Sequence, residues 1–167
     1  LPRPFLRRHH LGVAAAADME LRAEGIGHAY GSTEVLQDIN LAITSGRIVC
    51  LVGPSGCGKS TLLRFLGGLE QPTTGRVTQA GAPPDGCLNA LTYIFQDFAL
   101  LPWRTVRGNV SLVLEDHGIR GQQAEAIIGD VLARTKLSDF GHALPRQLSG
   151  GMKQRVAIAR GLAVKPA

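Results

Sequence analysis

The chain has 167 residues, of which 44% are hydrophobic and 19% charged, with a formal net charge of +5. This length and composition suit one folded domain with an ordinary core and exclude a disordered or fibrous chain. No stretch approaches the ~20 consecutive apolar residues of a membrane-spanning helix, so any membrane association is expected to go through a partner. Cys50, Cys57 and Cys87 lack metal-ligand spacing, and their odd number favours a reducing compartment over a disulfide scaffold.

Residues 1–18 differ from the rest of the chain. Their charged residues are Arg3, Arg7, Arg8 and Asp18, which contribute +2 to the net charge. The +3 left for the remainder is too little to predict a nucleic-acid partner. The apolar run after Arg8 is too short for a secretory signal, and Met19 is a candidate start. We therefore expect 1–18 to be a disordered or mistranslated leader.

The first half of the chain is strand-rich. Strand-like segments run over 21–43, with a turn at 30–33, and another turn follows at Ser45-Gly46. Residues 48–52 are a continuous apolar run, which is typical of a strand buried on both faces of a sheet. A helix is predicted over 61–66, a turn-rich region over 71–75 and a short strand over 76–79. Residues 91–95 are a second candidate for a buried strand.

The second half is helical. Helices are predicted over 106–115, over 122–135 and over 151–164. The second of these carries an apolar stripe of Ala126, Ile127, Val131 and Leu132. The pattern predicts a separate helical lobe.

Residues 53–60 read Gly-Pro-Ser-Gly-Cys-Gly-Lys-Ser, between a predicted strand and a predicted helix. This is the P-loop pattern in the context that phosphate binding needs, because its glycines let backbone N–H groups point inward at a helix N-terminus. Lys59 is expected to reach the β- and γ-phosphates, and the Ser60 hydroxyl to bind Mg²⁺. A merely steric glycine turn would explain neither residue. Cys57 could serve redox chemistry at a helix N-terminus, but we expect a small spacer.

A second phosphate-binding helix end is predicted where Leu148-Ser149-Gly150-Gly151-Met152 opens the last helix. Two such ends in one chain favour a dimer, in which Ser149 and Gly150 act on nucleotide held by the other subunit.

With the following Lys-Gln-Arg-Val-Ala-Ile-Ala-Arg, these motifs resemble the ATP-binding subunits of ABC transporters, over roughly 21–167. The resemblance implies an α/β fold: a P-loop NTPase (ABC ATPase) core with an antiparallel β subdomain over about 19–100, a helical subdomain over about 101–148, and a signature helix over 149–167. It implies ATP and Mg²⁺ as ligands and a head-to-tail dimer with a second ATP-binding subunit.

Tyr30 falls at the family's adenine-stacking position, although it could be a half-buried aromatic beside a turn. Gln96 falls at the Q-loop glutamine, which contacts Mg²⁺ and the attacking water, although it could be an ordinary polar strand end. The residues expected to bind nucleotide are Tyr30, Gly53, Pro54, Ser55, Gly56, Cys57, Gly58, Lys59, Ser60, Thr61, Ser149, Gly150 and Gly151. Catalytic roles are expected for Lys59 and Gln96, and metal binding for Ser60 and Gln96.

The apolar residues between 98 and 103 are Phe98, Leu100, Leu101 and Trp103. They either fill a core or, as the resemblance implies, dock transmembrane permease subunits, with Trp103 as the main candidate. Met152, where the family often has Gln, and the segment 95–110 resemble the nitrate, sulfonate, taurine and bicarbonate importer branch. This implies a peripheral protein at the cytoplasmic face of the cell membrane that couples ATP hydrolysis to import of a small solute, such as an anion.

The family's next element after the signature helix is an apolar strand that ends in Asp-Glu, followed later by a switch histidine. Neither occurs in the given sequence. No Asp-Glu pair follows Ser149, and the histidines all precede it: His9, His10, His28, His117 and His142. We therefore expect a chain truncated before the Walker B strand, inactive in ATP hydrolysis although its full-length parent is active. The alternatives are a soluble ABC ATPase acting on DNA or ribosomes and a non-catalytic fragment, which the full-length sequence would separate.

Overall fold

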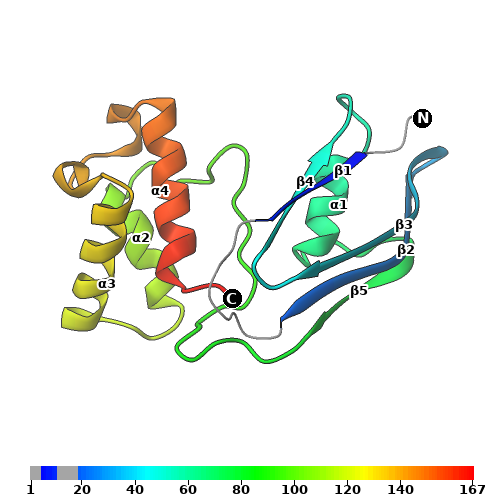
Figure 1. Cartoon of the computed structure of the whole chain (residues 1–167). Coiled ribbons are helices and arrows are strands. Elements are labelled where there is room, and N and C mark those ends of the chain that lie inside the picture. The colour runs from blue at the N-terminus through cyan, green and yellow to red at the C-terminus, as the bar shows by residue number, and fades with distance from the viewer. Residues whose placement is uncertain (1–4, 11–18) are drawn as a thin grey trace. The chain divides into compact units, whose positions relative to one another are not determined.

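The computed structural model describes residues 5–10 and 19–167, which divide into two compact units (Figure 1). The first unit runs to Asp85, and the second comprises Gly86–Pro166. Each unit has its own hydrophobic core. Strands and one helix build the first unit, whereas helices dominate the second.

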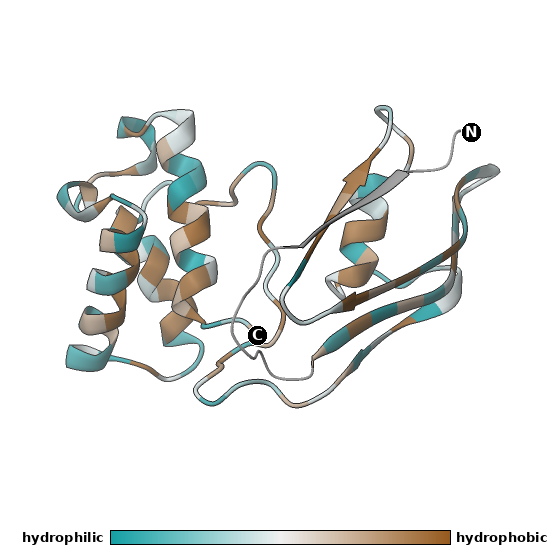
Figure 2. Cartoon of the chain, in the orientation of Figure 1, coloured by the Kyte–Doolittle hydropathy of each residue, from teal (hydrophilic) through white to brown (hydrophobic). Residues whose placement is uncertain are grey.

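An antiparallel three-stranded sheet in the order β3-β2-β5 forms the base of the first unit. Its strands are β2 (Glu20–Tyr30), β3 (Thr33–Thr44) and β5 (Thr74–Ala80). This confirms the predicted strands over 21–43 and 76–79 and the turn between them. Hydrophobic and hydrophilic residues alternate along β2 (Figure 2), and Ala23 and Ile26 are buried. The alternation gives the sheet one face for a core and one for solvent.

Helix α1 (Lys59–Leu66) packs on the apolar face of this sheet. It confirms the helix predicted over 61–66 and begins two residues earlier. Leu62, Phe65 and Leu66 are spaced so that they share one side of the helix, and all three are buried. Fully burying a side chain of this size stabilises by about 1.5–3 kcal/mol, so the contact fixes where the N-terminus of α1 lies.

Strand β4 (Arg47–Val52) confirms the strand predicted over 48–52. The prediction that this strand is buried on both faces is wrong. Ile48 is 51% exposed and Val52 52% exposed. In the described ranges, the strand beside β4 is β1 (Phe5–His10), which pairs with it antiparallel, so β4 lies in a two-stranded sheet and not at the centre of a larger one. β1 falls within the predicted leader. For 1–4 and 11–18 that prediction lies outside the described residues.

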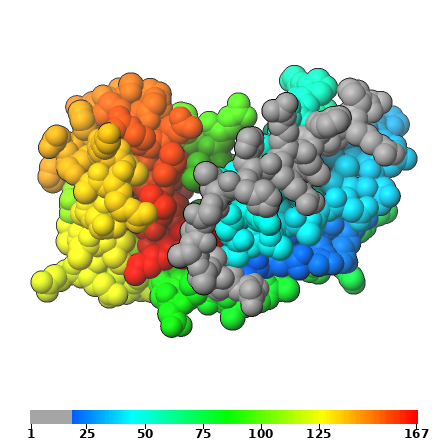
Figure 3. Space-filling view, viewed as in Figure 1, coloured from blue at the N-terminus to red at the C-terminus, as the bar shows by residue number. Residues whose placement is uncertain are grey.

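The second unit packs three helices around one core: α2 (Val106–Glu115), α3 (Gly121–Arg134) and α4 (Gly150–Ala163). All three predicted helices are confirmed to within one residue at each end. Two short 3-10 turns, η1 (Ser138–Phe140) and η2 (Pro145–Gln147), connect α3 to α4. Thr105 begins α2, because its hydroxyl accepts a hydrogen bond from the Gly108 N–H at 3.1 Å. The space-filling view shows α3 and α4 at the surface of this unit (Figure 3).

The segment before α2 is irregular, so the strand predicted over 91–95 is wrong. An apolar run forms a strand only where a neighbour supplies partners for its backbone groups, and the described part of the chain places no strand beside this one. Ile94 and Phe95 are 46% and 41% exposed. The backbone instead follows α4, where the Leu88 N–H donates to the Val164 carbonyl at 3.0 Å. Residues 86–100 therefore belong to the second unit.

Candidate nucleotide-binding site

The loop between β4 and α1 ends at a helix N-terminus that its own side chains leave uncapped. Gly58 is the N-cap of α1, with a left-handed φ of 88°, and no side chain caps the helix. No acidic residue lies in the first turn. The first-turn N–H groups and the positive end of the helix dipole are therefore available to an anion.

Packing against β3 explains why a glycine stands at position 58. A Cβ built on Gly58 would lie 2.7 Å from Leu36 Cδ2 and 3.0 Å from the Val35 carbonyl oxygen. A larger residue would require the Leu36 side chain and the Val35 carbonyl to shift. The close approach therefore fixes the distance between this loop and β3.

The Lys59 ammonium is held by the loop itself. Its Nζ donates to the Gly53 carbonyl at 2.9 Å and the Pro54 carbonyl at 2.6 Å, and lies 3.6 Å from the Cys57 sulfur. Lys59 is half-buried and Cys57 is buried, whereas Ser60 is exposed. Together the ammonium and the free N–H groups make a compact cluster of donors, as a polyphosphate needs.

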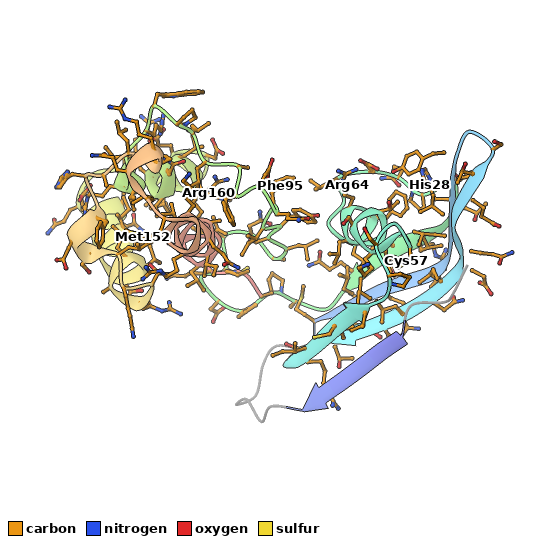
Figure 4. All side chains as sticks on the ribbon, turned by 90° about the horizontal axis from the view of Figure 1, so that it is seen from above. His28, Cys57, Arg64, Phe95, Met152 and Arg160 are labelled. Atoms are coloured by element: carbon orange, nitrogen blue, oxygen red, sulfur yellow. The ribbon has the colours of Figure 1, made fainter. Side chains whose placement is uncertain are left out.

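The N-terminus of α4 is a second uncharged, accessible helix end. Ser149 is its N-cap, and the Ser149 Oγ accepts from the Met152 N–H at 3.3 Å. Gly150 and Gly151 are exposed, and a Cβ on either would meet nothing within 4 Å. Figure 4 labels Met152 at this end of the helix. The serine hydroxyl keeps its own proton as a donor.

Tyr30 lies at the end of β2 and is 50% exposed. Its hydroxyl donates to Glu70 at 3.4 Å, and its ring meets the edge of His28 at a centroid distance of 4.6 Å. His28 in turn contacts Phe65 in the last turn of α1. These contacts lie toward the end of α1 opposite the phosphate loop. Adenine stacking by Tyr30 stays a prediction.

Gln96 is exposed and lies in a turn, not at the end of a strand. It belongs to the second unit and Ser60 to the first. A shared role of the two residues in Mg²⁺ binding therefore stays a prediction. In the described ranges no three His, Cys, Asp or Glu side chains gather into a metal site.

The four apolar residues after Gln96 divide by exposure. Phe98, Leu100 and Leu101 are half-buried, whereas Trp103 is 73% exposed. Core packing therefore accounts for part of the cluster, and Trp103 is the accessible member.

Two residues that shape this segment were not singled out from the sequence. Asn109 is fully buried; its side-chain oxygen accepts from the Leu101 N–H at 2.8 Å, and its amide donates to the Leu101, Arg104 and Thr105 carbonyls. Arg160 of α4 donates to the Ala99 carbonyl at 2.5 Å. The sequence signal that could have identified Asn109 is a polar residue on the buried stripe of α2. No feature of the neighbouring sequence identifies Arg160.

A strand, a glycine-rich loop and an uncapped helix end, placed on an antiparallel sheet and accompanied by a helical unit, define a P-loop NTPase. The model of the ABC transporter family matches residues 36–167, and the chain belongs to this family. A solved structure, the ATP-binding subunit of an ABC transporter, superimposes with a TM-score of 0.68 at 23% identity, covering 87% of this chain and 62% of that one. This likeness supports the fold.

Three curated relatives have matching sequences. The aliphatic sulfonates import ATP-binding protein SsuB 1 of Xanthomonas axonopodis pv. citri (strain 306) is 46% identical over 141 residues, which is 84% of this chain and 56% of that protein. The taurine import ATP-binding protein TauB of Yersinia pestis bv. Antiqua is 42% identical, over 87% of this chain and 57% of that protein. The probable sulfate/thiosulfate import ATP-binding protein CysA of Chlorella vulgaris is 41% identical, over 89% of this chain and 64% of that protein. The chain thus spans 56–64% of the length of these relatives. Among the described residues, no helix has the length and apolar character to cross a membrane.

Proposed function

We propose that this chain is the nucleotide-binding part of an ABC importer's ATP-binding subunit, which couples ATP binding and hydrolysis to transport of a small solute. The observation that carries the proposal is the Lys59 ammonium, held by loop carbonyls at the uncapped N-terminus of α1. A triphosphate suits this site because the Lys59 ammonium and the uncapped N–H groups of the first turn are donors and no carboxylate lies in that turn.

Each residue of the loop has a separate task in this proposal. The loop N–H groups cradle the phosphates, and Lys59 neutralises charge on the β- and γ-phosphates. Ser60 offers its hydroxyl to Mg²⁺, which supplies further charge neutralisation when it is bound with ATP. The proposed nucleotide-binding residues are Tyr30, Gly53, Pro54, Ser55, Gly56, Cys57, Gly58, Lys59, Ser60 and Thr61.

We assign the signature residues Ser149, Gly150 and Gly151 to nucleotide bound by a second subunit. Glycine inside a helix is unfavourable by roughly 1 kcal/mol relative to alanine. Neither Gly150 nor Gly151 has a positive φ or a neighbour that would exclude a side chain. Nothing within the described chain accounts for these glycines, which favours close approach by a group from outside it.

Gln96 is our candidate for orienting the attacking water and completing the Mg²⁺ shell. Its support is its place between the two phosphate-binding motifs and its exposure in a turn. Catalysis of phosphoryl transfer depends on positioning and electrostatics, so an amide that is held in place can contribute without taking a proton.

We further propose that the subunit is peripheral at the cytoplasmic face of the membrane and docks permease subunits through Trp103. An exposed tryptophan on a loop held by Asn109 is typical of an interface anchor.

Relatives named for import of sulfonates, taurine and sulfate favour a small oxyanion as the solute. Uptake of labelled taurine, sulfate and nitrate by cells with and without the gene would identify it, and equal uptake of all three in both would contradict this choice.

The nucleotide site is tested with Lys59→Met in the full-length protein, which keeps the apolar stem and removes the ammonium. We expect affinity for ATP with Mg²⁺ to fall at least about tenfold, because a charge-assisted contact to phosphate is lost. Arg134→Met is the control, since it removes a positive charge from the exposed face of α3. Equal affinity of parent and Lys59→Met would contradict the proposal.

A further inference from the structure

The turn that follows Gln96 has an unfavourable backbone. Gln96 to Ala99 form a turn in which the Phe98 N–H donates to the Phe95 carbonyl at 3.1 Å. Phe98 has a φ of 65° and Ala99 a φ of 44°. Both lie in the left-handed region, which residues with a Cβ rarely adopt. Two such residues in succession need an external contact to hold them.

That contact comes from the last turn of the signature helix. The Arg160 guanidinium of α4 donates to the Ala99 carbonyl at 2.5 Å. Burial lowers the pKa of Arg160 below its ordinary value, yet a guanidinium stays charged in proteins. A charged donor makes a shorter and stronger hydrogen bond than a neutral one. The bond therefore suits the task of holding a carbonyl in an unfavourable turn.

The residue next to Arg160 lies close to the chain on the other side of Gln96. A Cβ built on Gly161 would lie 3.3 Å from Thr92 Cγ2 and 3.6 Å from Ile94 Cδ1. The segment before Gln96 therefore lies directly on α4, and a side chain at 161 would require its neighbours to shift slightly. Figure 4 labels Arg160 and Phe95, which belong to these neighbouring segments of the second unit. Arg160 thus holds the chain after the glutamine, and its neighbour Gly161 lets the chain before the glutamine approach the same helix.

We propose that Arg160 is a positioning residue for Gln96. Its guanidinium holds the left-handed turn at Ala99, which fixes the glutamine relative to α4, the helix whose N-terminus is Ser149. Arg160 acts through the backbone of the turn and contacts no nucleotide. The inference rests on the proposed function, because it needs Gln96 to act in hydrolysis.

The test uses the full-length protein with variants at two positions. Arg160→Met keeps the apolar stem and removes the donors, and we expect a fall in kcat for ATP hydrolysis of roughly ten- to a hundredfold. ATP affinity should change less than about twofold, because the Lys59 contacts lie in the first unit. Arg160→Lys keeps one donor and should retain an intermediate kcat. Hydrogen exchange over 96–100 should rise in Arg160→Met and less in Arg160→Lys.

A second substitution separates positioning from general support of α4. Ala99→Gly removes the cost of the left-handed φ, so the double variant Arg160→Met with Ala99→Gly should recover part of the lost kcat. In a Gln96→Ala background, Arg160→Met should cost no further activity. The inference would be overturned if the double variant recovered no kcat. It would also be overturned if Arg160→Met lowered kcat in the Gln96→Ala background by the same factor as in the parent.

The two proposals fail in distinguishable ways. If Lys59→Met abolishes ATP binding but Arg160→Met leaves kcat unchanged, the nucleotide site stands and the role of Arg160 is refuted. If Lys59→Met binds ATP as the parent does, the proposed function itself fails.

Discussion

Gly58 lies so close to β3 that a larger residue would crowd Leu36 and Val35. We predict that Gly58→Ala lowers the free energy of unfolding more than Gly56→Ala does, by about 1–3 kcal/mol, the cost of overpacking. Both glycines have a left-handed φ, 88° and 79°, but a Cβ on Gly56 would meet nothing within 4 Å whereas one on Gly58 would meet β3. The backbone cost therefore cancels in the comparison. Urea unfolding of the two variants measures the difference. Equal losses of unfolding free energy would show that β3 accommodates a Cβ at position 58 without overpacking.

Asn109 shows why part of the site escaped prediction from the sequence. Its position on a helix could be predicted, since the apolar period of 106–115 is local information. Its four hydrogen bonds to the preceding loop could not, because they depend on how that loop folds back over the helix. The same reason applies to Arg160, whose partner Ala99 lies far away in the chain.

The elements divide in the same way. Helices α1 to α4 and the phosphate loop follow from periodicity, glycines and capping residues that lie within a few positions of one another. The apolar runs at 48–52 and 91–95 have equally clear sequences, yet the first lies in a two-stranded sheet and the second forms no strand. Strand burial depends on neighbours supplied by distant segments, and a single sequence does not contain that information.

Helix α2 ends at a carboxylate that makes its stability depend on pH. Hydrogen bonds from Arg104, then from Ser111, hold the pKa of Glu115 below its ordinary value of 4.5. A carboxylate with a lowered folded pKa stabilises fully above its unfolded pKa, and that stability is lost as pH falls through the folded value. We predict that Glu115→Gln destabilises the protein at neutral pH and that the difference from the parent shrinks below about pH 4.5.

Urea unfolding at a series of pH values tests this dependence. Asp130→Asn is the control for loss of one carboxylate, because Asp130 lies on the exposed face of α3. A difference between parent and Glu115→Gln that is the same in acid as at neutral pH would contradict the assignment.

Two helix ends that we propose to bind phosphate lie in separate units of one chain. We predict that cysteines placed at Ser55 and Ser149 of the full-length protein form cross-links between chains when a non-hydrolysable ATP analogue is bound. The reason is that Gly150 and Gly151 leave open space that this chain does not use. Cross-links confined to single chains would refute action in trans. Cysteine at Ser32, in the exposed turn between β2 and β3, replaces the one at Ser55 as the control.

Trp103 is the only tryptophan of this chain, and it is 73% exposed on a loop that the buried Asn109 anchors. The protein therefore carries its own optical reporter at the surface where we place the permease. An indole that moves from water into an apolar interface emits at shorter wavelength and is shielded from quenchers such as iodide. We predict both changes when membrane subunits bind, and their loss in Trp103→Phe. A titration that leaves the emission spectrum and the iodide quenching unaltered would place the docking surface elsewhere. Because the indole is already largely in water before docking, unfolding of the helical unit would not imitate this shift to shorter wavelength.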